Sequence, residues 1–258
     1  MKVEIFASGS SGNCLLVSDS QTRILVDVGI TFKKLQIALL NTDIRAEDID
    51  GVLITHEHSD HVCGLPVLVN KLGVPVYAPR TVYHRLVGTF PKLEDSIAII
   101  PVGEEFVVGT VCVTAFHTPH DTDESVGYRL SGEGSFAVAT DMGHVTEEIL
   151  RGLCGVDAAL IESNHDIDML RYGRYPVSLK RRVLSDHGHL SNADCAVLAR
   201  TLALTGTKQI ILGHLSVENN RPELALQAST AALNGLAELY CAPRSGYLKI
   251  ETGACVKC

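Results

Sequence analysis

GVLITHEHSDHVC is the sequence of residues 51–63. The β-branched apolar run Val52–Thr55 predicts a short buried strand. Because successive side chains of an extended chain alternate between its two faces, His56 and His58 point the same way and are spaced to hold one ion. Asp60 and His61 follow the turn and are placed to hold a second. Burying so many polar groups without a metal would cost several kcal/mol, so the stretch predicts a metal site rather than a polar loop.

The composition predicts one folded domain over residues 1–258. The chain is 46% hydrophobic, which is enough to bury a full core, and its 22 glycines indicate an α/β protein with many turns. The formal charge of −8 argues against a protein that coats nucleic acid by bulk attraction. A local basic patch remains compatible with that charge, and two divalent ions would add positive charge at the site itself.

The ends of the chain carry no targeting signal that we recognise. Residues 1–10 read MKVEIFASGS without a signal-peptide core, and no apolar run approaches membrane-spanning length. We therefore expect a soluble, cytoplasmic protein with no membrane partner, whose eight cysteines are mostly reduced. Cys255 and Cys258 form a lone C-x-x-C, and we expect residues 253–258 to be a frayed tail rather than a zinc site.

Short apolar runs alternate with helical patterns along the chain. Strands grouped between helical blocks predict sheets packed together with helices outside. The turn Ser8–Asn13 presents Ser10, Ser11 and Asn13, which either cradle a phosphate or belong to a flexible hairpin. Asp27 ends a strand, either as a turn residue or as a carboxylate that braces a metal ligand. The principal predicted elements are strands at Val3–Ala7, Cys14–Ser18, Arg23–Val28, Phe106–Phe116, Ser135–Thr140 and Gln209–Gly213, and helices at Phe32–Leu40 and Val62–Leu72.

Three further predicted strands each end in one or two residues of the types that bind metals. One ends in His117 and His120, the next in Asp141 and the last in His214. Each repeats the pattern of the first stretch, in which a buried strand carries such a residue at its carboxyl end. Four strands with the same pattern predict one shared site at one edge of the sheets.

The pattern His56-x-His58-x-Asp60-His61, with its downstream partners, resembles the metallo-β-lactamase family. The resemblance implies an αββα sandwich with two metals between the loops at one edge. It assigns the first metal to His56, His58 and His120, the second to Asp60, His61 and His214, and the bridging position to Asp141. His120 is preferred to His117 because its Pro-His-Asp context matches the family better. Two divalent ions are expected, with zinc favoured by the imidazoles and manganese or iron as alternatives.

The ligand pattern separates some branches of that family and leaves others together. Flavodiiron-type oxidoreductases carry Glu where this chain has His58. True β-lactamases generally lack the bridging acid, which is Asp141 here. Glyoxalase II-type thioesterases and the nuclease branches retain the full set. The metals alone therefore imply a hydrolase of undefined substrate.

The second half of the chain narrows the class of substrate. The runs ESNHD (162–166), GHLSN (188–192) and GHLS-x-ENN (213–220) resemble the YycJ/WalJ branch, relatives of RNase Z and RNase J. That resemblance implies a phosphodiesterase of nucleic acid, with 5′-to-3′ DNA exonuclease activity first. It makes Asn164, His165 and Asn219 candidate substrate contacts. The alternatives are an RNA nuclease, a hydrolase of small phosphodiesters or cyclic nucleotides, a thioesterase, and a metal-binding regulatory protein without turnover.

A basic stretch supports nucleic acid as the substrate. Residues 171–182 hold five of the 22 Lys and Arg residues, with two Tyr and no acid. Cations with aromatics suit phosphates and unstacked bases, so Arg171 and Arg174 are candidate contacts. A solvated helix face is the alternative, which fits Lys180–Arg182 well.

The predicted chemistry assigns roles to four residues. Asp60 is expected to bind metal and to orient the attacking water. His189 is the first candidate for the general acid, with His187 second and His165 third, because the pKa of a histidine lies near working pH.

Overall fold

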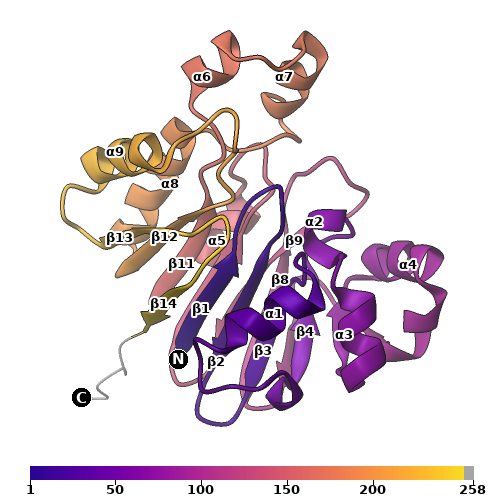
Figure 1. Cartoon of the computed structure of the whole chain (residues 1–258). Helices are drawn as coiled ribbons and strands as arrows, with labels where there is room; N and C mark the ends of the chain where they lie inside the picture. The colour runs from indigo at the N-terminus through magenta and orange to yellow at the C-terminus, as the bar shows by residue number, and fades with distance from the viewer. Residues whose placement is uncertain (253–258) are drawn as a thin grey trace, which may run out of the picture.

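The strands form two seven-stranded sheets (Figure 1). The computed structural model describes residues 1–252. The first sheet runs in the order β14 (Leu248–Glu251), β1 (Lys2–Ala7), β2 (Cys14–Ser18), β3 (Arg23–Val26), β4 (Gly51–Leu53), β5 (Val76–Ala78), β6 (Ile97–Ile99). The second runs β13 (Glu238–Cys241), β12 (Gln209–Gly213), β11 (Ala158–Glu162), β10 (Ser135–Ala139), β9 (Val126–Ser131), β8 (Val111–His117), β7 (Glu105–Val108).

Alternating side chains place each sheet between two apolar layers. In β2, Leu15 and Val17 face the core between the sheets, whereas Leu16 faces the helices outside. The inner core joins these residues to Tyr128 and Leu160 of the second sheet. Both faces of these strands are therefore buried, as expected for sheets covered on each side.

Helices cover the two outer faces. The first sheet is covered by α1 (Phe32–Leu39), α3 (Leu65–Leu72) and α4 (Arg80–Thr89), with the short helices α2 (Ser59–Val62), η1 (Ala46–Asp48) and η2 (Pro91–Ser96) in the connections. The second sheet is covered by α5 (Glu147–Leu153), α8 (Asn192–Leu204) and α9 (Pro222–Leu233). The predicted αββα sandwich is confirmed.

Two short helices stand apart from these layers. Figure 1 shows α6 (Ile167–Tyr172) and α7 (Val177–Val183) beyond the ends of the strands. In the chain, they follow β11 and precede α8. Leu170 and Val183 are the buried residues of these two helices.

The topology brings the carboxyl ends of many strands to one edge. Neighbouring strands from β3 to β6 are parallel, and so are those from β10 to β13. Strand β8 runs in the same direction as β10, because each is antiparallel to β9. The segments that follow β3, β4, β8, β10, β11 and β12 carry the predicted ligands and their neighbours.

Two predictions are wrong because each treats as one element a segment that is interrupted in the structure. The strand expected over Phe106–Phe116 is a hairpin of β7 and β8, which turns at Gly109 with a φ of 58°. The helix expected over Val62–Leu72 is interrupted after α2. The Gly64 N–H donates to the Val28 carbonyl and the Asp60 carbonyl accepts from the Asn13 N–H. The two backbone groups that a continuous helix would pair with each other are thus bonded to other segments.

Some predicted features fall on residues outside the described part of the chain. Cys255 and Cys258, with the predicted frayed tail 253–258, fall outside the described residues. Within residues 1–252, the helices are too short or too polar for any of them to span a bilayer.

Candidate metal centre

The backbone delivers several polar side chains through an unusual conformation. Asp27, Asp141 and His214 follow β3, β10 and β12, and their φ angles of 59°, 58° and 53° lie in the left-handed region. A residue with a Cβ that is held there costs on the order of 1–3 kcal/mol. The turns that carry these three side chains are therefore held in place by the surrounding contacts.

The first group of donors consists of His56, His58 and His120. One ring nitrogen of each lies within 4.8 Å of the others. His56 Nε2 and His58 Nδ1 are 3.1 Å apart. His117 lies outside the group, half exposed, with its Nδ1 3.1 Å from Glu148 Oε1. The structure thus places His120 rather than His117 in this group.

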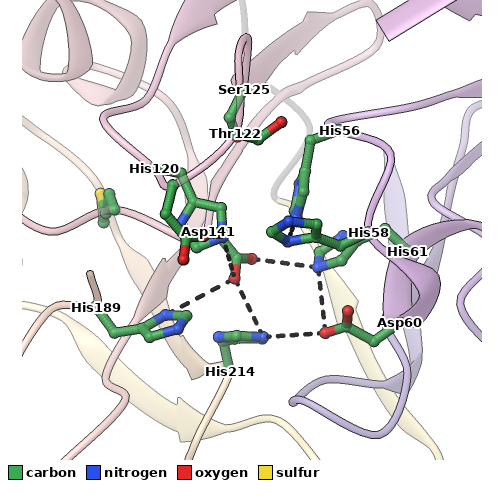
Figure 2. Close-up of polar contacts among 12 residues, drawn as sticks. His56, His58, Asp60, His61, His120, Thr122, Ser125, Asp141, His189 and His214 are labelled. Carbon is green, nitrogen blue, oxygen red and sulfur yellow. Dashed lines mark hydrogen bonds and ion pairs between the residues drawn. The ribbon is translucent and has the colours of Figure 1, made fainter. Parts of the chain in front are cut away.

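The second group consists of Asp60, His61 and His214. Asp60 Oδ2 lies 3.7 Å from His61 Nε2 and 3.8 Å from His214 Nε2. Asp141 lies between the two groups (Figure 2). Its Oδ2 is 3.3 Å from His61 Nε2, and its Oδ1 is 3.5 Å from His214 Nε2 and 3.7 Å from His120 Nε2. Asp141 therefore occupies the position of a bridging ligand.

The donor atoms fit metal ions of ordinary size. Four ligands at about 2.0–2.1 Å from a zinc ion lie about 3.3 Å from one another, close to the separations above. Asp141 Oδ2 and His214 Nε2 are buried and have no hydrogen-bond partner among residues 1–252. Buried polar atoms are normally satisfied, so these orphans favour a bound cation.

The electrostatics of the centre also favour a cation. Burial would raise the pKa of Asp141, but His214 and His61 outweigh it and hold that pKa well below its usual range. Burial lowers the pKa of His61, but Asp27 and Asp141 outweigh burial and raise it to about 10. The buried carboxylates thus draw positive charge onto the imidazoles. Divalent ions would supply the same charge and leave the histidines neutral as ligands.

Asp27 and Thr55 orient His61. Asp27 Oδ2 accepts hydrogen bonds from His61 Nδ1 at 2.7 Å and from the Thr55 hydroxyl at 2.9 Å, while Oδ1 accepts from the Thr55 backbone N–H at 2.9 Å. This leaves His61 Nε2 facing the centre. Asp27 lies where a bracing carboxylate is expected. Thr55 was missed by the sequence analysis, and its Oγ1 also lies 3.0 Å from His56 Nδ1.

Glu162 is the other residue that the sequence analysis missed. Its fully buried Oε1 accepts from His189 Nδ1 at 2.8 Å and from His214 Nδ1 at 2.9 Å. Its Oε2 accepts from the backbone N–H groups of Met142 and Leu190 at 2.8 and 3.3 Å. Burial would raise its pKa, but His189 and His214 lower it to about 2. The signal was an acid at the end of an apolar strand, as at Asp141.

The three candidate acids lie in different surroundings. His189 borders the centre, with Nδ1 3.8 Å from Asp141 Oδ1. Burial lowers the pKa of His189, but Glu162 outweighs burial and raises it. His187 is exposed. His165 is 1% exposed, and neither of its ring nitrogens has a hydrogen-bond partner in the described chain.

The remaining predicted contacts divide into buried and exposed residues. Asn13, Asn164 and Asn219 are buried. Asn164 Nδ2 donates to the His214 carbonyl at 3.0 Å, and the Asn219 carbonyl accepts from the Asp166 N–H. Ser10, Ser11, Arg171 and Arg174 are exposed.

Asn13 also contacts a predicted ligand. Its Nδ2 lies 2.9 Å from His61 Nε2, the nitrogen that faces the centre. The carbonyls of Gly9 and Asp60 are 3.2 and 3.4 Å from the same amide. These carbonyls can take the amide protons, so Asn13 can leave His61 Nε2 to a metal ion.

Comparisons with known proteins place this geometry in context. The family model for the beta-lactamase superfamily domain matches residues 22–215. The chain is 39% identical over 233 residues to the exodeoxyribonuclease YycJ of Bacillus anthracis, covering 89% of this chain and 88% of that protein. It is 41% identical over 229 residues to the exodeoxyribonuclease WalJ of Streptococcus pneumoniae D39, covering 87% and 85%. Among solved structures, the metallo-beta-lactamase fold protein YhfI of Bacillus subtilis matches with a TM-score of 0.73 at 17% identity, covering 96% of this chain and 98% of that one.

Proposed function

This chain belongs to the metallo-β-lactamase superfamily, and from that premise we propose that it is a dinuclear 5′-to-3′ exonuclease of DNA. A metal-dependent hydrolase is supported by the two donor groups and by the relatives together. The observation that carries the dinuclear hydrolase chemistry is Asp141, which lies within 3.7 Å of nitrogens from both groups.

DNA as the substrate follows from the full-length similarity to two exodeoxyribonucleases. The cations of residues 171–182, including the exposed Arg171 and Arg174, support a polyanionic substrate. Zinc is the proposed ion because five of the seven proposed ligands are imidazoles, and manganese is the first alternative. A cytoplasmic location is part of the proposal, since the six cysteines among residues 1–252 are all free thiols.

The seven proposed ligands would hold two divalent ions in the division described above. When bound, such ions stabilise charge on a phosphoryl group and lower the pKa of water. Asp60 is part of the second group and its side chain is 22% accessible to solvent. Burial would raise the pKa of Asp60, but the neighbouring His214 and His61 imidazoles outweigh burial and lower it. Asp60 is therefore ionised and able to accept a proton from the attacking water, which orients that water.

His189 would protonate the leaving alkoxide. Glu162 holds Nδ1, so the ring has a fixed orientation and the raised pKa keeps a proton available near neutral pH. The partly accessible side chain borders the centre without belonging to the seven proposed ligands. Glu162 therefore acts through His189 and His214 as a positioning residue.

The direct test uses purified protein loaded with Zn²⁺ or Mn²⁺. The substrates are 5′-phosphorylated duplex DNA labelled at either end, single-stranded DNA, RNA, bis-p-nitrophenyl phosphate and a glutathione thioester. We expect early release of the 5′-labelled mononucleotide from DNA and none after treatment with EDTA. Early release of the 3′ label would reverse the polarity. Hydrolysis of RNA or of the thioester in preference to DNA would replace the proposed substrate, and no hydrolysis of any substrate would favour a regulatory protein.

A further inference from the structure

The α6–α7 segment, residues 167–184, presents an outer surface that the predicted chemistry does not use. Tyr172 is 86% exposed, the most exposed of the large apolar and aromatic residues among residues 1–252. Val177 and Leu184 are exposed on the same segment. Tyrosine combines a large apolar ring with a polar hydroxyl and is enriched at interfaces, so this surface is a candidate binding site.

The cations of this segment fall into two classes. Lys180 and Arg182 have partners, since Lys180 Nζ donates to the Arg171 carbonyl at 2.8 Å and Arg182 forms an ion pair with Asp121. The side chains of Arg171, Arg174 and Arg181 are exposed and have no hydrogen bond or ion pair with any residue in 1–252. Three unpaired guanidinium groups on a chain of net charge −8 create a local positive surface.

Contacts at its base connect this surface to the metal centre. Asp121, the partner of Arg182, also has its Oδ1 3.1 Å from Nε2 of the proposed ligand His120. On the other side, Gly173 directly follows Tyr172. A Cβ built on Gly173 would lie 2.9 Å from Asn219 Oδ1, in the loop that follows His214. The surface is therefore continuous with the loops of both donor groups.

We propose that α6–α7 is a platform for an unpaired DNA strand, on which a base stacks against Tyr172 while Arg171, Arg174 and Arg181 contact phosphates. This inference rests on the proposed function and adds to it that the substrate reaches the centre as a single strand. An exposed aromatic ring offers a stacking partner only to a base that is not already stacked in a duplex. Exposed cations beside it match the repeating charge of the strand. A rigid blunt duplex presents phosphates but no free base face.

Binding measured without cleavage tests the platform. The metal-loaded protein is titrated into a fluorescein-labelled phosphorothioate oligothymidylate of about twenty nucleotides, and fluorescence anisotropy gives the dissociation constant. A blunt phosphorothioate duplex is the comparison ligand. We expect the strand to bind at least about tenfold more tightly than the duplex, and Y172A to weaken strand binding about tenfold. Y172F keeps the ring and should bind within about twofold of the unmodified protein.

A charge variant with a matched control tests the cations. The triple variant R171Q/R174Q/R181Q should lower the salt slope of strand binding by about two, at about 0.7 per phosphate contact. The control K33Q/R80Q/K92Q removes the same charge from exposed positions on α1, α4 and η2 and should leave that slope unchanged. The control variant should also hydrolyse bis-p-nitrophenyl phosphate at the original rate, because Lys33, Arg80 and Lys92 lie outside the metal centre and the platform.

The outcomes separate this inference from the proposed function. Equal binding by Y172A and the unmodified protein, equal binding of strand and duplex, or equal effects of the two triple variants would overturn the platform. If strand binding depends on Tyr172 but unmodified DNA is not hydrolysed, the platform stands and the exonuclease proposal fails. If DNA is hydrolysed and none of the variants changes binding, the proposed function stands and the platform fails.

Discussion

The two donor groups differ in how their imidazoles are braced. In the second group, His61 donates its Nδ1 proton to Asp27 at 2.7 Å, and His214 donates its Nδ1 proton to Glu162 at 2.9 Å. In the first group, His56 Nδ1 contacts only the Thr55 hydroxyl, and His120 Nδ1 has no hydrogen-bond partner in the described chain. A carboxylate on the outer nitrogen fixes the ring and raises its basicity as a ligand. We therefore expect the second group to bind metal more tightly than the first.

The largest expected effect comes from the residue that the two groups share. Among residues 1–252, Asp141 is the one carboxylate that lies within 3.7 Å of nitrogens from both groups. Asp141→Ala should therefore lose metal from both groups, and hydrolysis should fall at least about a thousandfold. Elemental analysis of the purified variant measures the metal directly. Retention of two ions per chain would show that Asp141 is not the shared ligand.

His189 belongs to neither donor group, so its substitution should change turnover without changing metal binding. His189→Ala should keep both ions and lose about 10²–10⁴ in kcat, because the group that protonates the leaving oxygen is missing. His187→Ala, at an exposed neighbouring position, is the control and should keep kcat within about twofold. Unchanged kcat for His189→Ala on saturating DNA would remove His189 from the mechanism.

Asp27→Asn tests the brace of the second group. The amide nitrogen of asparagine cannot accept the His61 Nδ1 proton, so affinity at the second group should fall about 10–100-fold. Affinity at the first group should be unchanged. Calorimetric titration of the metal-free protein resolves the two binding steps. A uniform loss in both steps would mean that the groups are not braced independently.

Thr55→Val should have the smallest effect of the four changes. It removes the hydroxyl next to His56 Nδ1 and one of the donors to Asp27, at a cost of about 1 kcal/mol in the free energy of unfolding. First-group affinity should fall by less than about tenfold. Chemical denaturation and the same calorimetric titration measure both quantities. A larger loss than that of Asp27→Asn would reverse the order of bracing between the two groups.

The fold and the predicted ligands could be anticipated because both follow from short-range patterns. Short apolar runs predict β2 and β12 with their observed bounds. Side chains at the carboxyl ends of strands converge because parallel strands share an edge. This is why His120, Asp141 and His214 were grouped with the segment His56–His61 before any tertiary contact was known.

Features that depend on contacts between distant segments could not be anticipated. The break at Gly64 follows from backbone hydrogen bonds to Val28 and Asn13, which are remote in sequence. Asn164 and Asn219 have the residue types of substrate contacts, but both are buried, and the Asn164 amide donates to the His214 carbonyl. Glu162 carries the same strand-end signal as Asp141, yet only the fold shows that it contacts two imidazoles at once.

The pairing of β1 with β14 has a consequence for biosynthesis. These strands lie at opposite ends of the described chain, with Lys2 opposite Glu251 and Ile5 opposite Leu248. Until the ribosome has released β14, β1 has no neighbour on that side, and its row of backbone donors and acceptors is open to other chains. Unpaired strand edges promote aggregation. Translation interrupted between His214 and Leu248 would therefore leave a nascent chain with all seven proposed ligands present and the first sheet unfinished. Such a product is one for chaperones or proteases to remove.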